Sequence, residues 1–171
     1  MNLVSVTLNE VLAARDERAA RQKKMQAEFH TALISLTVVT PGEVKRTDNA
    51  KFVADIADEF IKNSFGEKLL TKVVTDKLTG YEIIYSIDLD PIAIKKITAT
   101  YENSHPLGRL MDIDVIAANG VSVSRNEIGM ENRLCLLCDK PSAYCVKART
   151  HTNEQLQEKI KKMIAEFRQS Q

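Results

Sequence analysis

Apolar side chains recur every three or four positions near the start of the chain, a spacing that is typical of an amphipathic helix. Thr7 and Glu10 have the spacing of a capping box, so the helix is expected to begin there. No Gly or Pro interrupts the chain from this point until Pro41. The pattern therefore predicts a long first helix. Its expected apolar stripe consists of Leu8, Val11, Leu12, Met25 and Phe29.

Three further stretches have the same helical spacing. The second helix is predicted from residue 47 or 48 to about residue 63, and a glycine follows it closely. The third covers residues 91–103 after an Asp-Pro pair that suits a helix start, and the fourth covers residues 152–168. Their expected buried residues are Phe52, Ile56, Phe60 and Ile61 in the second, Ile94 and Ile97 in the third, and Leu156, Ile160, Met163, Ile164 and Phe167 in the fourth.

Runs rich in β-branched and other apolar residues separate these helices and predict strands. Residues 31–39 have the composition of a buried strand, which ends at the turn signal Pro41-Gly42. Residues 69–76 and 81–89 are two β-rich runs joined by a short segment that contains a glycine. We therefore expect these two runs to form a hairpin.

A last strand is predicted over residues 110–116, and we expect it to be the central strand of the sheet. Asn119-Gly120 follows it, and this dipeptide is a strong signal for a tight hairpin turn. A two-residue turn would bring Arg125 back antiparallel to a position near Asp114. The overall order of elements indicates an α+β fold, with about four helices covering an antiparallel or mixed sheet. Because no linker, repeat or low-complexity segment is present, residues 1–171 are expected to form one domain.

Composition and charge narrow the functional class. A chain of 171 residues with 44% hydrophobic and 27% charged residues is typical of a globular protein that buries a core. A net charge of +1 does not favour binding to nucleic acid or to an anionic membrane. No apolar run approaches the roughly 20 residues that span a bilayer, and no signal-peptide pattern opens the chain. We therefore expect a cytoplasmic protein without nucleic-acid or membrane partners.

Two carboxylates interrupt the last predicted strand. Asp112 and Asp114 are two positions apart, which places both side chains on one face of a strand. Like charges this close repel one another, so a cation between them is expected. Mg²⁺ suits two carboxylates together with substrate phosphates, because it prefers hard oxygen ligands. The alternative interpretation is a polar strand face that simply meets solvent.

Several cationic side chains could accompany an anionic substrate at these carboxylates. Some are close to them in sequence, and others lie on one face of the first helix or on the loop after the first strand. For the helix face, an ordinary solvated surface is the competing interpretation. The candidates are Arg109, Arg125 and His105 near the carboxylates, and Arg15, Arg18 and Lys45 in the N-terminal part.

Three cysteines and a histidine lie close together near the C-terminus. Cys135 and Cys138 have the spacing of a short chelate loop, and Cys145 and His151 would complete a set of four ligands. These residues could close a tetrahedral structural Zn²⁺ site. That the cysteines are ordinary thiols is an equally open interpretation, whereas their odd number argues against a disulfide framework.

Residues 105–115, with the sequence HPLGRLMDIDV, resemble the signature of the apo-citrate lyase phosphoribosyl-dephospho-CoA transferases, the holo-acyl-carrier-protein synthases of citrate lyase. The similarity extends over nearly the whole chain. It departs from the family pattern at Met111, where a bulkier residue is usual, and at Glu43, where a proline often follows the Pro-Gly turn. The other similar segments are Ala14–Arg18 with Gln22, Thr37–Lys45, Ser124-Arg125, Gly129, Arg133–Cys138, Cys145, His151 and the terminal helix.

The resemblance implies a specific reaction. Enzymes of this family attach the triphosphoribosyl-dephospho-CoA precursor to a serine of the citrate lyase acyl carrier protein, the gamma subunit, and diphosphate leaves. By analogy of chemistry, a nucleotidyltransferase-like core is expected. The implied roles are Mg²⁺ ligands for Asp112 and Asp114, triphosphate binding for Arg109 and Arg125, and further substrate contacts for Arg15, Arg18, Lys45 and His105.

Two other functions stay open. The same transfer could serve the carrier protein of malonate decarboxylase or another carrier. The chain could instead be a non-catalytic, zinc-stabilised binding module whose aspartates lie on a wetted strand. Transfer assays with each carrier protein, combined with substitution of the two aspartates, separate these three hypotheses.

Overall fold

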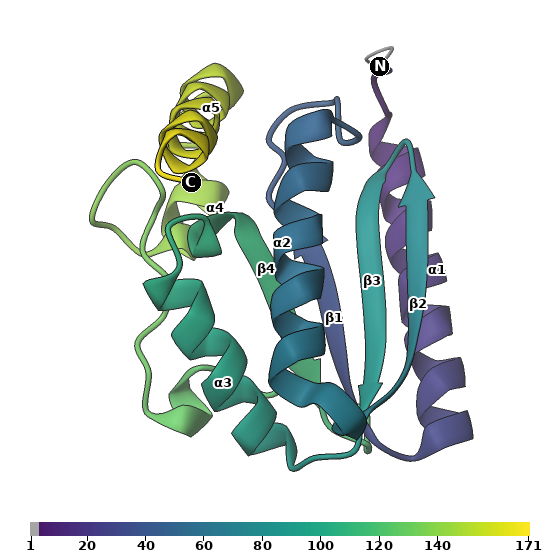
Figure 1. Cartoon of the computed structure of the whole chain (residues 1–171). Coiled ribbons are helices and arrows are strands. Elements are labelled where there is room, and N and C mark those ends of the chain that lie inside the picture. Colours follow the sequence, from purple (N-terminus) through teal and green to yellow (C-terminus); the bar gives the residue numbers. More distant parts are fainter. Residues whose placement is uncertain (1–3) are drawn as a thin grey trace.

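The computed structural model describes residues 4–171 and contains five α-helices and one four-stranded antiparallel sheet with the order β2-β3-β1-β4 (Figure 1). The predicted α+β class is confirmed, with one helix more than expected. Short 3₁₀ turns occupy Gly66–Lys68, Gly108–Leu110 and Asn126–Ile128. The helices are α1 (Leu8–Phe29), α2 (Asp48–Phe65), α3 (Pro91–Ser104), α4 (Ser142–Ala148) and α5 (Asn153–Gln169), and the strands are β1 (Ala32–Val38), β2 (Leu69–Lys77), β3 (Gly80–Ile87) and β4 (Met111–Ile116).

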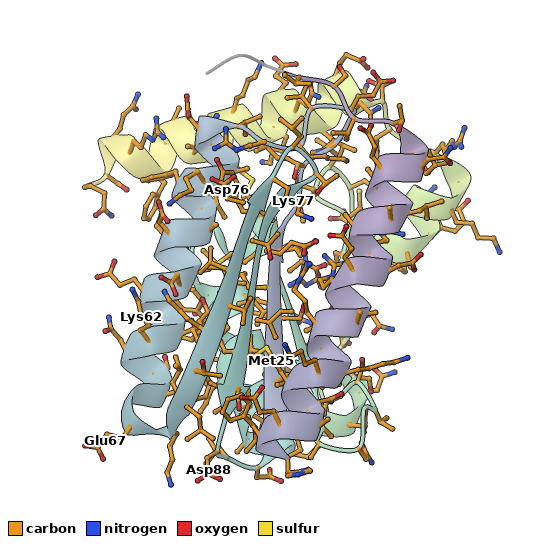
Figure 2. The ribbon with its side chains drawn as sticks, turned by 90° about the vertical axis from the view of Figure 1, so that its right-hand side faces the viewer. Met25, Lys62, Glu67, Asp76, Lys77 and Asp88 are labelled. Atoms are coloured by element: carbon orange, nitrogen blue, oxygen red, sulfur yellow. The ribbon has the colours of Figure 1, made fainter. Side chains whose placement is uncertain are left out.

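Helices pack on both faces of the sheet. The main core lies on the face covered by α2, α3 and α5, where Leu36 and Ile113 meet Ile61, Ile94 and other buried apolar residues. On the opposite face, α1 contributes a smaller cluster in which Met25 packs with residues of three strands (Figures 1 and 2). Among residues 4–171 no helix is both long and apolar enough to span a membrane.

The predicted helix starts are confirmed by side-chain caps. Thr7 and Glu10 form the expected capping box, and Thr47, Asp90 and Thr152 each cap the helix that follows. These caps matter because the first backbone N–H groups of a helix have no partner within the helix. The starts of these four helices could therefore be predicted from local sequence alone.

Two expected apolar stripes were wrong in part. Leu8 and Leu12 are 72% and 45% exposed, because α1 meets the sheet through apolar residues only near its C-terminal end. Ile97 is 37% exposed, because α3 turns Ile94 and Thr98 toward the sheet instead. In α2 and α5 the predicted residues, apart from Leu156, do pack against the core. Ile61 and Ile164 are buried there, and Phe52, Ile56, Phe60, Ile160, Met163 and Phe167 are partly buried.

Strand β4 lies at an edge of the sheet, so its expected central position was wrong. The expected second hairpin is confirmed only in part. The chain turns back antiparallel to β4 at Asn119-Gly120, and the Val123 N–H donates to the Val115 carbonyl at 2.8 Å, but among the described residues no full strand forms on this edge. After the turn at Asn119-Gly120 the chain makes one bridge, between Ile116 and Ser122, and then leaves. Continuing that register would set Ser124 opposite Asp114. Arg125 therefore does not reach the site through strand pairing.

Side chains of α3 explain why no fifth strand is needed. The Ile113 N–H donates to Glu102 Oε1 at 3.0 Å, and the Ile113 carbonyl accepts from Lys95 Nζ at 3.1 Å. These two charged groups take the places that a neighbouring strand would fill in the hydrogen-bond ladder. The backbone groups of a buried edge are thereby satisfied.

Helix α4 was not predicted. It has seven residues, and Cys145 is its only buried side chain, so no apolar stripe reveals it in the sequence. The loop before it returns on itself through a single bridge between Leu134 and Pro141. This segment matters for function because it forms one wall of the site described next.

Candidate active site

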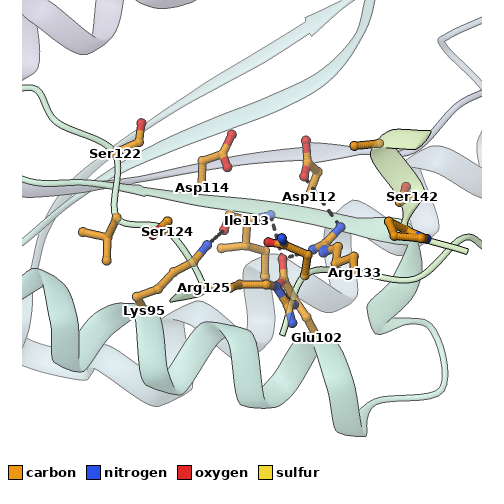
Figure 3. A pocket seen from close by; sticks show the side chains of 14 residues that line it. Lys95, Glu102, Asp112, Ile113, Asp114, Ser122, Ser124, Arg125, Arg133 and Ser142 are labelled. Atoms are coloured by element: carbon orange, nitrogen blue, oxygen red, sulfur yellow. Dashed lines mark hydrogen bonds and ion pairs between the residues drawn. The ribbon is translucent and has the colours of Figure 1, made fainter. Parts of the chain in front are cut away.

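Asp112 and Asp114 project side by side from β4 into an open hollow of about 500 Å³ (Figure 3). Both side chains are exposed while their neighbours along the strand are buried, as the two-residue spacing predicts. The hollow is bounded by the start of α4 near Ser142, by the chain after β4 near Ser124, and by charged side chains of α3.

The two aspartates differ in their surroundings. Asp112 is 51% exposed, and one of its oxygens accepts a 3.4 Å hydrogen bond from Thr37 on β1. Surrounding protein atoms displace water from around Asp114, although its carboxylate reaches solvent, and this raises its pKa. The charge of Asp112 raises the pKa of Asp114 further, whereas Lys95 opposes the shift. A bound cation would favour the ionised form of Asp114.

Glu102 organises the charged wall of the hollow. Its side chain is 2% exposed, and besides the Ile113 N–H it accepts hydrogen bonds from Arg125 and Arg133. The Arg125 contact is 2.5 Å long. A buried carboxylate is costly unless it is paired, and the charge-assisted hydrogen bonds that pair Glu102 also hold both guanidinium groups beside β4 (Figure 3).

Arg133 also contacts β4 directly. One of its terminal nitrogens donates to the Met111 carbonyl at 2.7 Å, and the other lies 3.6 Å from Asp112 Oδ1. Lys95 approaches from α3, and its ammonium is buried, which lowers its pKa. Three cationic groups therefore line the hollow around the aspartate pair: Lys95, Arg125 and Arg133.

Sequence reasoning missed Lys95, Glu102 and Arg133 as site residues. A signal for the first two was present, because they lie two helical turns apart on the inner face of α3, together with Ile94 and Ala99. A charged residue on such a face is rarely buried without a partner. Arg133 lies in an irregular loop and has no comparable local signal.

Replacing Glu102 with alanine is expected to destabilise the protein by about 3–5 kcal/mol, because two guanidinium groups would lose their buried partner. Urea unfolding at pH 7 measures this loss. Glu166→Ala is a suitable control: Glu166 is 63% exposed and only 3.8 Å from Lys162, so a change of roughly 0.5 kcal/mol or less is expected. Equal effects of the two substitutions would contradict the importance of the Glu102 cluster.

His105 and Arg109, both predicted as site residues, do not line the hollow. His105 packs between Tyr101 and Phe167 with ring centroids about 5 Å apart, and its Nδ1 accepts the Leu107 N–H. Burial lowers the pKa of His105. Arg109 donates to the Leu134 carbonyl. The contacts of both side chains are with neighbouring rings or backbone groups, and these contacts stabilise the local structure.

The N-terminal cations gather on the aspartate face of the sheet. Arg18 is 3.0 Å from Glu82, and Lys45 donates to the Thr40 carbonyl at 2.6 Å. Burial and the nearby charge of Arg15 lower the pKa of Lys45. The structure thus brings Arg15 and Lys45 close to each other, although neither lines the hollow itself.

The four predicted metal ligands come together in space. The ligand atoms of Cys135, Cys138, Cys145 and His151 all lie within 4.8 Å of one another. The Sγ atoms of Cys138 and Cys145 are 3.6 Å apart, and His151 Nε2 is 3.4 Å from Cys138 Sγ. Tetrahedral sulfur ligands about 2.3 Å from Zn²⁺ would be separated by about 3.8 Å, so this group can hold a metal ion.

Comparison with known proteins adds the family context. The family model described as apo-citrate lyase phosphoribosyl-dephospho-CoA transferase matches residues 6–167. A protein of that name from Shigella flexneri serotype 5b is 33% identical over 150 residues, which cover 86% of this chain and 82% of the relative. Relatives of the same name from Escherichia coli strains UTI89 and SE11 match to the same extent. The family match includes both the aspartate strand and the cysteine-histidine cluster.

Proposed function

The chain belongs to the apo-citrate lyase phosphoribosyl-dephospho-CoA transferase family, and from this premise we propose that it loads the acyl carrier protein of citrate lyase with its prosthetic group. The proposed donor is triphosphoribosyl-dephospho-CoA, the acceptor is a serine hydroxyl of the carrier, and diphosphate is released. The observation that supports this most directly is the pair of aspartates flanked by two arginines in one open hollow.

The proposed step is a phosphoryl-group substitution. The serine oxygen forms a bond to the innermost phosphorus of the triphosphate, the bond from that phosphorus to the diphosphate breaks, and the serine proton is released. Because the nucleophile belongs to the carrier, this chain has to position the reactants and neutralise charge. An open hollow suits that task, since a protein-bound serine must reach the phosphorus from outside.

Asp112 and Asp114 are the proposed Mg²⁺ ligands. Their carboxylates share one face of β4, and burial together with the charge of Asp112 raises the pKa of Asp114. Two hard oxygen ligands of this kind match the preference of Mg²⁺, which usually binds through one or two carboxylates and substrate phosphates. When bound, the ion would neutralise charge on the phosphate oxygens.

Arg125 and Arg133 are the proposed phosphate contacts. Glu102 holds one terminal nitrogen of each guanidinium, and Asn103 Oδ1 accepts from the other terminal nitrogen of Arg125 at 3.0 Å. The N–H donors that these contacts leave unused can bind phosphate oxygens in a fixed orientation. A donor that is already held in place costs little further ordering when the substrate binds. Arg109, Arg15, Lys45 and His105 remain predicted substrate contacts of lower rank, because they do not line the hollow.

The cysteine-histidine cluster is proposed to bind a structural Zn²⁺ ion. Four nitrogen and sulfur ligands with no further open position are typical of structural sites. Arg133 precedes Cys135 by two residues, and Ser142 precedes Cys145 by three. A metal ion there would therefore hold the wall of the hollow without taking part in the reaction.

The proposed function is tested by a carrier-loading assay. The purified protein is mixed with apo-citrate lyase carrier and the donor, with or without Mg²⁺, and the carrier is weighed by mass spectrometry. We expect the carrier to gain the phosphoribosyl-dephospho-CoA group only when Mg²⁺ is present. Preferred loading of the malonate decarboxylase carrier would reassign the acceptor, and an unchanged mass for both carriers would contradict the proposed transfer.

A further inference from the structure

A second charged group lies between α1 and the sheet, outside the aspartate hollow. Glu82 on β3 is buried, and its two carboxylate oxygens contact Arg18 Nη1 at 3.0 Å and Arg21 Nη2 at 2.5 Å. One buried carboxylate thus holds two guanidinium groups of one helix. Glu17 lies 3.5 Å from the other terminal nitrogen of Arg21, whereas Glu82 is the one carboxylate that contacts Arg18 among the described residues.

The strand register connects Glu82 with the aspartate pair. Thr37 on β1 lies opposite Glu82 on one side and opposite Asp112 on the other. The three residues therefore form a row across adjacent strands, with their side chains on the same face. Since neighbouring strands are about 4.8 Å apart, the backbones at the two ends of the row are separated by roughly 10 Å.

Further positive charge lies next to this row. Arg15 is one helical turn before Arg18, and Lys45 is close enough to Arg15 for their charges to interact. Within residues 4–171 neither Arg15 nor Lys45 forms an ion pair with a carboxylate, and Lys45 bonds to the Thr40 carbonyl instead. Uncompensated cations beside a candidate phosphate site favour a polyanionic ligand.

We propose that Glu82 is a positioning residue that holds Arg18 over the sheet, where its free N–H donors bind the polyphosphate of the donor substrate. This inference rests on the proposed function. Glu82 occupies one terminal nitrogen of Arg18, and a guanidinium has five N–H donors. The Arg18 side chain is still 24% exposed, so its remaining donors are accessible to a ligand.

Other contacts can keep α1 in place when Glu82 is changed. Gln22 donates to Ser35 Oγ at 3.0 Å, and Gln26 donates to the Ala117 carbonyl at 2.8 Å. Met25 and Phe29 pack in the apolar cluster near the end of the helix. A variant of Glu82 is therefore expected to fold, and its effect can be separated from the loss of the helix.

The test is a double-mutant cycle of Glu82→Gln and Arg18→Gln, with Glu28→Gln on the exposed side of α1 as the control. Each single substitution is expected to raise the KM for the donor about tenfold, because a charge-assisted hydrogen bond is lost, with little change in the KM for the carrier. The double variant should be no worse than Arg18→Gln alone. A merely structural role of Glu82 predicts additive effects that act equally on both substrates.

A measurement of triphosphate binding, which does not depend on carrier loading, tests this inference separately from the proposed function. Inorganic triphosphate is titrated into the folded protein by calorimetry, and Glu82→Gln is expected to weaken its binding about tenfold. If the wild-type protein loads no carrier, the proposed function fails, whereas the triphosphate titration still tests Glu82. Unchanged triphosphate affinity, or an unchanged KM for the donor, would overturn the inference. Should Glu82→Gln not fold, Arg18→Gln alone must show both effects.

Discussion

Replacing Asp112 or Asp114 with asparagine is expected to lower the rate of carrier loading by about 1,000-fold. Each substitution removes one of the two proposed Mg²⁺ ligands on β4, and a catalytic metal ion stabilises the transition state by several kcal/mol. A loss of about 4 kcal/mol corresponds to about 1,000-fold in rate. The measurement is the initial rate of carrier loading, followed by mass spectrometry at saturating donor.

Asp88→Asn is the matched control for this experiment, because Asp88 is an exposed aspartate at the far end of β3. Its loading rate should equal that of the wild-type protein. Circular dichroism should show that all three variants are folded. Near-normal loading by both Asp112→Asn and Asp114→Asn would mean that the aspartates lie on a wetted strand without a catalytic role.

The thermal stability of Asp114→Asn should rise in the absence of Mg²⁺, although its loading rate falls. Because the protein raises the pKa of Asp114, its ionised form is disfavoured in the folded state. This cost is present at pH values above the raised pKa and disappears as the pH falls below the ordinary value. Asp114→Asn should therefore raise the Tm at pH 7 in magnesium-free buffer. Added Mg²⁺ should raise the Tm of the wild-type protein and leave that of Asp114→Asn unchanged.

Loss of the proposed zinc ion is the second large effect. His151→Asn is expected to abolish zinc binding and to reduce carrier loading to near background. Among residues 129–151 Cys145 is the only buried side chain, so apolar burial alone offers little to hold this segment. Without the ion, the segment should unfold locally and release Arg133 from the hollow. Metal analysis, limited proteolysis and the loading assay measure the three consequences.

His30→Asn is the control for this substitution. His30 ends α1 in a left-handed conformation with φ 55°, which asparagine adopts readily. Its zinc content, protease resistance and loading rate should match the wild type. A wild-type protein that is purified without zinc, resists proteolysis in residues 129–151 and loads the carrier normally would contradict the zinc proposal.

The elements that could be predicted from sequence share a physical basis. Helix α5 and strand β1 bury continuous apolar stripes, and local caps mark the helix starts. Helix α4 lacks both features, since it has one buried residue and no side-chain cap. The edge position of β4 could not be predicted either. Its apolar residues indicate that the strand is buried, but they do not show whether its outer edge is covered by another strand or by side chains.

The residues of the candidate site could likewise be predicted only in part. Spacing alone was enough to place Asp112 and Asp114 on one face and to group the metal ligands as candidates. The partners of the aspartates come from α3 and from the loop before α4, so they depend on how these segments pack beside β4. Arg125 illustrates the limit: it does line the hollow, but it is held by Glu102 and does not arrive through the expected hairpin.

Glu102 and Lys95, which bond to the backbone at the outer edge of β4, also determine where another chain could add a strand to this sheet. Intermolecular strand pairing requires free backbone groups, and at Ile113 these are already taken by Glu102 and Lys95. The other edge, β2, is the remaining place for such pairing, and it carries Lys72 and Lys77. Self-association through strands would therefore occur across the molecule from the hollow and leave its mouth accessible to a protein substrate.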